Sequence, residues 1–256
     1  MSTWRVRSAL VSIGSLVGFL VVWELVSLKL PPVVLPHPTE VFAALWSLST
    51  SGQIGQAFLT MLAPLAEGFV LAMILGAAIG FFLGLNRWAA AAVDPLLYVI
   101  YSLPHVALLP LIIVWFGIGY NSTVIFVFIS AIFSVIVNTE SGVRNVDPGM
   151  LDVVRSLGAN RWEEIREVII PSTLPFLLSG MRIAVVMAVV GVIIAELFIS
   201  ATGVGYLLEY FSDTLQLAKY FAPLILVAAL GVLLKYGVDW LDRKLLPWRQ
   251  RQVGAE

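Results

Sequence analysis

The chain has 256 residues, of which 60% are hydrophobic and 12% are charged, and its formal net charge is −1. An average soluble domain carries about 25% charged residues, so this composition excludes an ordinary soluble protein and indicates an integral membrane protein. The balanced charge gives no sign of a polyanion-binding surface, and the lack of cysteine excludes disulfides, thiolate metal sites and cysteine nucleophiles.

Six apolar segments are long enough to cross a bilayer, which requires about 20 mostly apolar residues. They cover residues 9–28, 57–85, 93–116, 122–139, 174–199 and 221–238. The first follows two arginines but is too long for a signal peptide and has no A-x-A cleavage site after it, so we interpret it as a retained helix. The sequence therefore predicts an all-α membrane protein with about six transmembrane helices. We expect one domain over residues 1–256 with a core at about residues 57–241.

The distribution of positive charge predicts the orientation, because cytoplasmic loops carry the excess of lysine and arginine. The chain has 15 such residues. With the amino terminus inside, only Lys29 and Lys219 fall in outer connections, and most of the others lie on the inner side. We therefore expect both termini to be cytoplasmic.

Two segments contain residues with special backbone roles. In the second segment small residues recur every four positions, which predicts close approach of another helix; they are Ala72, Gly76, Gly80 and Gly84. The third segment contains Pro95, Pro104 and Pro110, which remove backbone donors and bend a helix. Proline is tolerated in membrane helices, and a bent helix can also line a pathway, so Pro104 and His105 are candidate pathway residues.

Ionisable side chains inside apolar segments are costly, and each is a candidate for function. They are Glu24, Glu67, Asp94, His105, Arg182, Glu196 and Lys235. We expect Asp94, Arg182 and Lys235, near the cytoplasmic ends, to reach water, or lipid phosphate for the two cations.

Three of these residues are candidates for a role in the pathway, each with its own interpretation. Glu67 either pairs with a polar group across the bundle or contacts the cargo. Glu196 is expected to face a water-filled vestibule near the outer surface. His105 is interpreted as a hydrogen-bonded interior histidine rather than a ligand. Glu67 and Glu196 join Pro104 and His105 as the candidate pathway residues.

Motifs for catalysis are missing from the sequence. It has no H-E-x-x-H zinc helix, no Walker phosphate loop and no nucleophile elbow. We therefore predict no catalytic residue, no metal ligand and no cofactor, and energy for uphill transport must come from a partner.

The most polar passage is the loop at residues 142–173, which contains "VDPGMLDVVRSLGANRWEEIREVIIP". Asp147 is a helix cap, and Gly158 suits the left-handed position that ends a helix. Asn160 and Glu163 form a capping-box pattern that starts a second helix, and Pro171 is expected to end or bend it. The pattern predicts two short helices joined at a glycine on the cytoplasmic face.

The first of these short helices carries an apolar ridge at helical spacing. The ridge consists of Met150, Leu151, Val154 and Leu157. An apolar helix face outside the membrane is typical of a helix that docks into a groove on a partner.

The same residues resemble the cytoplasmic signature of binding-protein-dependent ABC importer permeases, E-A-A, three residues, G, nine residues, I, one residue, L-P. The matching positions are Asp152, Val153 and Val154 for E-A-A, then Gly158, Val168, Ile170 and Pro171. Further segments, including "VDPLLYVIYSLPHVALLPLIIVWFGIG" and the terminal "DRKLLPW", are similar to the nitrate, sulfonate and taurine branch of these permeases.

The resemblance implies a type I ABC importer permease-like fold with a coupling helix between the fourth and fifth transmembrane helices. The implied ATPase-coupling residues are Met150, Leu151, Asp152, Val153, Val154, Arg155, Ser156, Leu157, Gly158 and Ala159. Asn160, Glu163 and Pro171 would support the loop. The implied partners are two cytoplasmic ATPases, a second permease copy and an external solute-binding protein. The implied location is a bacterial inner membrane.

The cargo stays open at this point. The branch usually has a serine and an arginine before the G-F of the second helix, whereas this chain has Thr60, Ala63, Pro64 and Glu67 there. The branch imports sulfonates, taurine, nitrate and also thiamine-pyrimidine precursors.

Two other classes of protein remain possible from the sequence. A self-sufficient secondary transporter would use midplane charges and broken helices, commonly in two related halves; Glu67 and the prolines fit it, but we find no internal repeat. An intramembrane enzyme fits less well, because the chain offers no paired set of catalytic residues.

Overall fold

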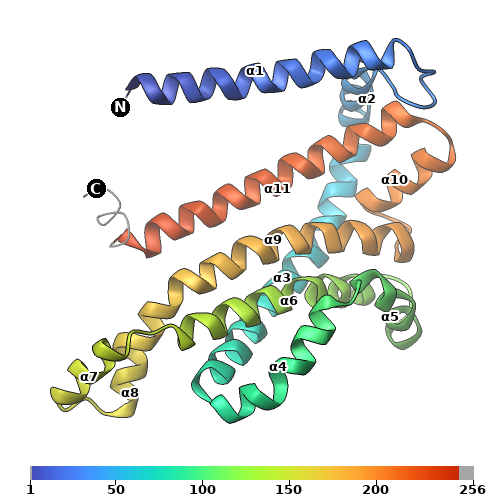
Figure 1. Ribbon diagram of the computed structural model, residues 1–256. Helices are drawn as coiled ribbons and strands as arrows, with labels where there is room; N and C mark the ends of the chain where they lie inside the picture. The colour runs from blue at the N-terminus through green and yellow to red at the C-terminus, as the bar shows by residue number, and fades with distance from the viewer. Residues whose placement is uncertain (1, 248–256) are drawn as a thin grey trace.

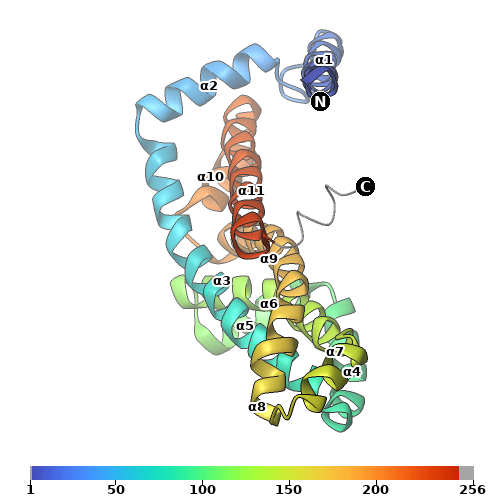
Figure 2. The same cartoon turned by 90° about the vertical axis from the view of Figure 1, so that its left-hand side faces the viewer.

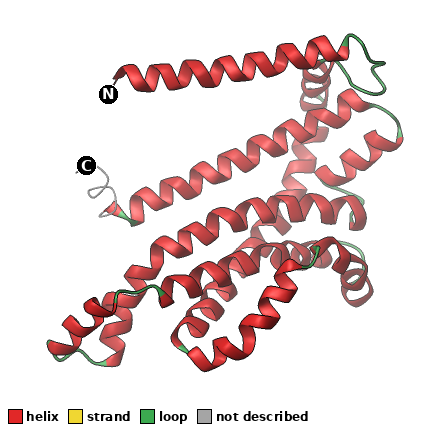
Figure 3. Ribbon diagram, viewed as in Figure 1, coloured by secondary structure: helices red, strands yellow, loops and turns green. Residues whose placement is uncertain are grey.

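The computed structural model describes residues 2–247, and all regular structure in that range is helical (Figures 1 and 3). The helices are α1 (Ser2–Ser27), α2 (Pro38–Thr50), α3 (Gln53–Leu85), α4 (Arg87–Ser102), η1 (His105–Leu108), α5 (Leu109–Phe116), α6 (Tyr120–Arg144), α7 (Pro148–Ser156), α8 (Arg161–Glu163), η2 (Glu164–Ile169), α9 (Ile170–Ile199), α10 (Val204–Asp213) and α11 (Leu217–Leu245). The prediction of an all-α protein is confirmed.

Four helices in the described range are long and apolar enough to cross a membrane. They are α3, α6, the continuous helix Arg161–Ile199 and α11. A fifth span exists if α4 and the η1–α5 pair are one broken helix. The described apolar part of α1, Gly14–Ser27, falls in the shorter class of 10–17 residues. Within the residues that could be assessed, the structure thus gives four or five spans where the sequence predicted six.

The third predicted segment, residues 93–116, is wrong as a single helix. The chain bends by 94° between α4 and the η1–α5 pair. Leu103 is extended, with φ −70° and ψ 141°, because it precedes Pro104, and a residue before proline avoids helical geometry. The predicted bend is therefore a complete break between two helices.

The centre of the molecule is built from α3, α6 and α9, which pack along their lengths (Figures 1 and 2). The small residues of α3 face α6: a Cβ added at Gly76 would lie 2.8 Å from the Cβ of Val135, and one at Gly84 would lie 2.5 Å from the Cβ of Val143. The close approach predicted from the four-residue spacing is confirmed.

The peripheral helices define the two ends of the bundle. α11 packs on α9 and on α2, whereas α1 contacts α2. In Figure 1 the start of α1, the end of α11 and α7–α8 lie at one end of the molecule, and α2, α5 and α10 lie at the other. We call these the inner and the outer end, after the orientation predicted from the distribution of positive charge.

Candidate coupling helix and solute cavity

Helix α7, the predicted coupling helix, has the expected start and stop signals. The Asp147 side chain accepts a hydrogen bond from the backbone amide of Gly149 at 2.8 Å, which caps the first turn. After Ser156 the chain turns at Gly158, whose φ of +86° lies in the left-handed region. Glycine adopts this conformation without the steric cost of a Cβ, so the prediction for Gly158 is confirmed.

The second helix starts at a complete capping box. Asn160 Oδ1 accepts from the amides of Trp162 and Glu163 at 2.9 and 3.1 Å, and Glu163 Oε2 accepts from the Asn160 amide at 2.7 Å. This helix then passes through the π-helical turn η2 into α9, which gives one helix of 39 residues, Arg161–Ile199.

Of the two predicted roles of Pro171, to end or to bend the second helix, the first is excluded because the helix continues through it. Pro171 lies in the first turn of α9. The helix changes there from π-helical to α-helical bonding.

The predicted apolar ridge of α7 divides into two faces. Leu151 and Val154 point inward and pack, with Ile165, against a cluster of buried side chains. The cluster consists of Val143, Val146, Val168 and Ile169. The exposed apolar face contains Met150, Val153 and Leu157, which are 53%, 59% and 81% exposed. We call these three residues the docking face. Half of the predicted ridge is thus wrong, because α7 uses it to hold on to its own chain.

A buried carboxylate connects the two short helices. Glu164 accepts from Arg155 Nε and Nη2 at 2.8 and 3.1 Å, and from Arg161 Nη1 at 2.9 Å. The hydrogen bond to Glu164 raises the pKa of the Arg155 guanidinium above its usual value. We call Arg155, Arg161 and Glu164 the arginine clamp. Sequence analysis missed Glu164, because nine residues separate it from Arg155 across a turn and no helical spacing marks the pair.

The other residues that were predicted to couple to an ATPase make only local contacts. Asp152 is exposed, with its Oδ1 3.6 Å from an Arg155 nitrogen. The Ser156 hydroxyl donates to the Val153 carbonyl of its own helix at 2.7 Å. The amide of Ala159 donates to the Val154 carbonyl at 3.0 Å, which closes the turn at Gly158.

Glu67 has the partner across the bundle that one interpretation required. The Tyr120 hydroxyl, at the start of α6, donates to Glu67 Oε2 at 2.7 Å. Glu67 itself stays exposed on α3, and its pair with Tyr120 is compatible with a surface that faces solute.

Glu196 is buried near the outer end of α9, with 3% of its surface exposed. Its Oε2 accepts from the amide of Gly205 at 2.9 Å, and this amide belongs to the first turn of α10. A Cβ added at Gly203, whose φ is +101°, would overlap the Glu196 carboxyl group. Glu196 therefore caps α10 as well as lining a cavity, and the prediction of an open vestibule is only partly right.

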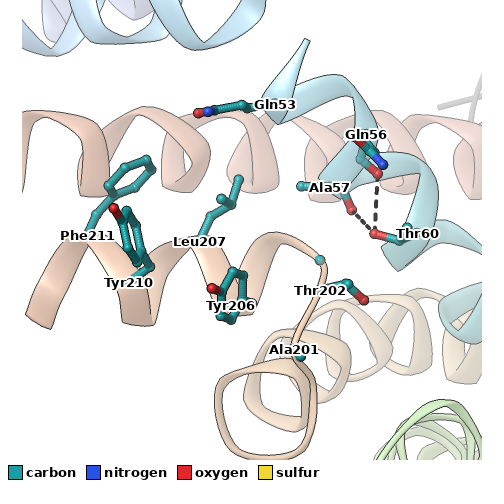
Figure 4. Close-up of a pocket in the computed structure, with 11 residues that line it drawn as sticks. Gln53, Gln56, Ala57, Thr60, Ala201, Thr202, Tyr206, Leu207, Tyr210 and Phe211 are labelled. Atoms are coloured by element: carbon teal, nitrogen blue, oxygen red, sulfur yellow. Dashed lines mark hydrogen bonds between the residues drawn. The ribbon is translucent and has the colours of Figure 1, made fainter. Parts of the chain in front are cut away.

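Two adjoining cavities occupy the outer half of the molecule. The inner cavity, of about 540 Å³, lies between α3, the start of α6 and the end of α9; its lining includes Thr60, Ala63, Tyr120, Glu196 and Thr202. The outer pocket, of about 380 Å³, lies between α3 and α10 (Figure 4). Both are lined by Thr60, Ala201 and Thr202.

The pathway candidates Pro104 and His105 lie away from these cavities. Pro104 is exposed at the break after α4. The His105 ring stacks on Phe133 at a centroid distance of 5.9 Å and an interplanar angle of 7°. Among the described residues no side chain or backbone group hydrogen-bonds to His105 Nε2. The structure thus places Glu67 and Glu196 near one cavity and His105 in another region, against Phe133.

Charges at the inner ends of the helices pair within the chain. Arg144 Nη2 lies 3.0 Å from Asp94 Oδ2 and 2.6 Å from Glu140 Oε1. Lys235 Nζ lies 3.1 Å from Asp239 Oδ2. Arg182 bridges Asp239 and Asp242 and thereby joins α9 to α11. The sequence analysis expected Arg182 and Lys235 to reach water or lipid phosphate and did not predict these pairs with acidic side chains of α11.

Comparison with known proteins places this architecture among transport permeases. The chain is 35% identical over 221 residues to SsuC of Bacillus subtilis (strain 168), named as a transport permease for aliphatic sulfonates, which covers 86% of this chain and 80% of SsuC. It is 30% identical over 234 residues to the formylaminopyrimidine transport permease protein ThiX of Halalkalibacterium halodurans, covering 91% and 93%.

The fold and the sequence family agree with these relatives. A chain of the MetNI methionine ABC transporter in inward-facing conformations has a TM-score of 0.63 and 18% identity, covering 77% of this chain and 98% of that one, which shows a shared fold. The family described as the binding-protein-dependent transport system inner membrane component matches residues 68–247. This chain therefore belongs to that family and is a transmembrane permease subunit of an ABC importer.

Proposed function

We propose that this chain couples ATP hydrolysis by a cytoplasmic partner to import of a small organic solute that an external binding protein delivers. Two permease copies form the pathway in a bacterial inner membrane, with both termini cytoplasmic. The whole chain acts as one transmembrane domain. The observation that carries the proposal is the docking face of α7 at the inner end, beside a helix that reaches the solute cavity.

The docking face is an exposed apolar surface of the kind that binds in a groove on a partner. Its three apolar side chains extend from a helix of nine residues between the predicted fourth and fifth spans. Burial of such side chains contributes about 1.5–3 kcal/mol each, whereas a free helix of this length is marginal in water. The Asp147 cap, the inward packing of Leu151 and the arginine clamp hold α7 in shape before any partner binds.

The connection from α7 to the cavity supports transmission of the ATPase stroke. The arginine clamp joins α7 to η2, and η2 continues into α9. Near its outer end α9 carries Glu196, which lines the inner cavity. A displacement of α7 by the partner therefore acts on the helix that borders the solute, and the pathway alternates its opening.

The energy source is assigned to the partner because the sequence has no phosphate-binding loop. We expect the purified permease in liposomes to release no phosphate from ATP. The relatives named for sulfonate and formylaminopyrimidine transport support a small organic cargo of this kind.

Site-specific crosslinking tests the coupling assignment, because the chain has no native cysteine. Val153 is 59% exposed and its neighbour Val154 faces inward. A thiol-directed photocrosslinker on Val153→Cys should capture the ATPase of the same importer, and the matched Val154→Cys variant should not. Equal capture at both positions, or capture at neither in a membrane-inserted protein, would exclude α7 as the coupling helix.

A further inference from the structure

A stripe of polar side chains runs along one face of α3. Gln53, Gln56, Thr60 and Glu67 are separated by three, four and seven positions, the spacing of a single helical face. All four are exposed in the protomer, although α3 is otherwise among the apolar spanning helices. Polar groups on a spanning helix are costly when they contact lipid, so we expect this face of α3 to contact water, solute or protein.

The stripe borders both cavities. Gln53, Gln56 and Thr60 line the outer pocket, and Figure 4 shows Tyr206 and Tyr210 of α10 on another side of the same pocket. Thr60 and Ala63 continue into the inner cavity. Glu67 lies one helical turn beyond Ala63 and holds the hydroxyl of Tyr120, which lines the same cavity. A solute that passes from the outer pocket to the inner cavity therefore approaches Glu67.

The residues that line the two cavities include an acidic side chain but no basic one. Among the described residues that line either of them there is no lysine or arginine. The Glu196 carboxyl group is buried and accepts from the Gly205 amide, whereas the Glu67 carboxylate, which accepts from Tyr120, is exposed beside the inner cavity. Lys219 Nζ lies 5.9 Å from the ring centroid of Phe211, which lines the outer pocket, so the excess of negative charge belongs to the inner cavity. Tyr206 and Tyr210 stack with a centroid distance of 6.4 Å and add aromatic surface at the entrance.

We infer that this face of α3 selects a positively charged organic solute, such as an amine or a cationic heterocycle, and disfavours sulfonates. A carboxylate beside a cavity with low-dielectric walls attracts cations and repels anions, and tyrosine rings attract cations through their faces. The inference rests on the proposed function, since it names the solute class for that pathway.

Charged thiol reagents test the inference without knowledge of the cargo. The permease–ATPase complex with Ala63→Cys is treated at low salt with trimethylammonioethyl or sulfonatoethyl methanethiosulfonate, each of which forms a disulfide and releases methanesulfinate. Ala63 and Glu67 are neighbours on the helix face, about 5–6 Å apart. Rates are divided by those at Ser51→Cys, which is exposed in the α2–α3 connection outside both cavities.

We expect the cationic reagent to react at least tenfold faster than the anionic one at Ala63→Cys. Added Glu67→Gln should bring the ratio close to one, whereas Tyr120→Phe, which keeps the carboxylate, should preserve the preference. An equal or faster anionic reaction, a ratio that Glu67→Gln leaves unchanged, or no reaction with either reagent would overturn the inference. If one of these outcomes is found and Val153→Cys still captures the ATPase, the inference about the solute class is wrong and the proposed coupling function is retained.

Discussion

Two short amphipathic helices, α7 at the inner end and α10 at the outer end, differ in how much of their apolar surface the chain itself buries. They have nine and ten residues, and each adjoins a spanning helix. α10 buries Val204, Leu208 and Phe211 against its own chain, whereas no residue of α7 is buried. An amphipathic pattern thus predicts that a helix has an apolar face, but does not predict whether the same chain or a partner covers it.

The glycine beside α10 is packed against its own chain, whereas the glycine beside α7 is not. Gly203 and Gly158 both have positive φ, +101° and +86°. A Cβ at Gly203 would overlap Glu196, whereas nothing lies within 4 Å of a Cβ at Gly158. Both glycines have positive φ but their surroundings differ, so equal substitutions at the two positions separate folding from partner binding.

Introduced charge should give the largest difference between the two helices. Leu208 is 3% exposed and Leu157 is 81% exposed. Leu208→Glu buries an unpaired charge and should cost about 4 kcal/mol or more, enough to prevent accumulation of folded protein. Leu157→Glu should leave the melting temperature in detergent unchanged and abolish recovery of the ATPase. If Leu157→Glu melts as early as Leu208→Glu, the docking face belongs to the core of the permease.

Valine at the two glycines should give the next largest difference. Both substitutions strain a left-handed backbone, which costs about 1–3 kcal/mol, but only Gly203→Val also displaces the carboxyl group that caps α10. We therefore expect Gly203→Val to lower the melting temperature more than Gly158→Val. The same loss at both sites would show that the Glu196 contact adds nothing to stability.

The effect of Gly158→Val should appear in coupling. The strained turn moves the docking face relative to the arginine clamp, so we expect less copurified ATPase and less uptake, with normal membrane insertion. Gly158→Ala provides the control, since its left-handed conformation is less costly than that of a β-branched residue. Normal ATPase recovery and uptake with valine would mean that the position of Gly158 has no role in coupling.

Removal of the charge at the centre of the clamp should have the smallest effect. Glu164→Gln keeps the shape of the side chain and weakens the hydrogen bonds from Arg155 and Arg161. We expect folded protein that still binds the ATPase, with a lower ratio of uptake to ATP hydrolysis. Glu163→Gln, which retains a capping-box side chain, serves as the control. A normal ratio with Glu164→Gln would remove the clamp from the transmission path.

The inner loop could be predicted from the sequence because its signals are local. The Asp147 cap, the Asn160–Glu163 capping box and the turn at Gly158 each involve residues within three positions of one another. The small-residue face of α3 was predictable for a similar reason, since a period of four marks one side of a helix. Patterns of this kind need no knowledge of tertiary contacts.

The missed features depend on contacts between distant parts of the chain. Which side of α7 packs inward is decided by Val168 and Ile169, which follow the next turn. The cap that Glu196 gives to α10 crosses a loop of nine positions, and the bond from Tyr120 to Glu67 spans 53. The prolines of the third segment predicted a bend, but its size of 94° depends on how η1 and α5 pack against α6.

The unbroken course of Arg161–Ile199 has a mechanical consequence. A helix of 39 residues is about 58 Å long at 1.5 Å per residue. A tilt of about 10° around its centre would carry each end through about 5 Å, close to one helical pitch. A modest rotation applied at the arginine clamp would therefore shift the Glu196 end by an amount comparable to the width of a small solute. The length of this helix, rather than a series of side-chain contacts, would then determine how far the Glu196 end moves for a given displacement at the arginine clamp.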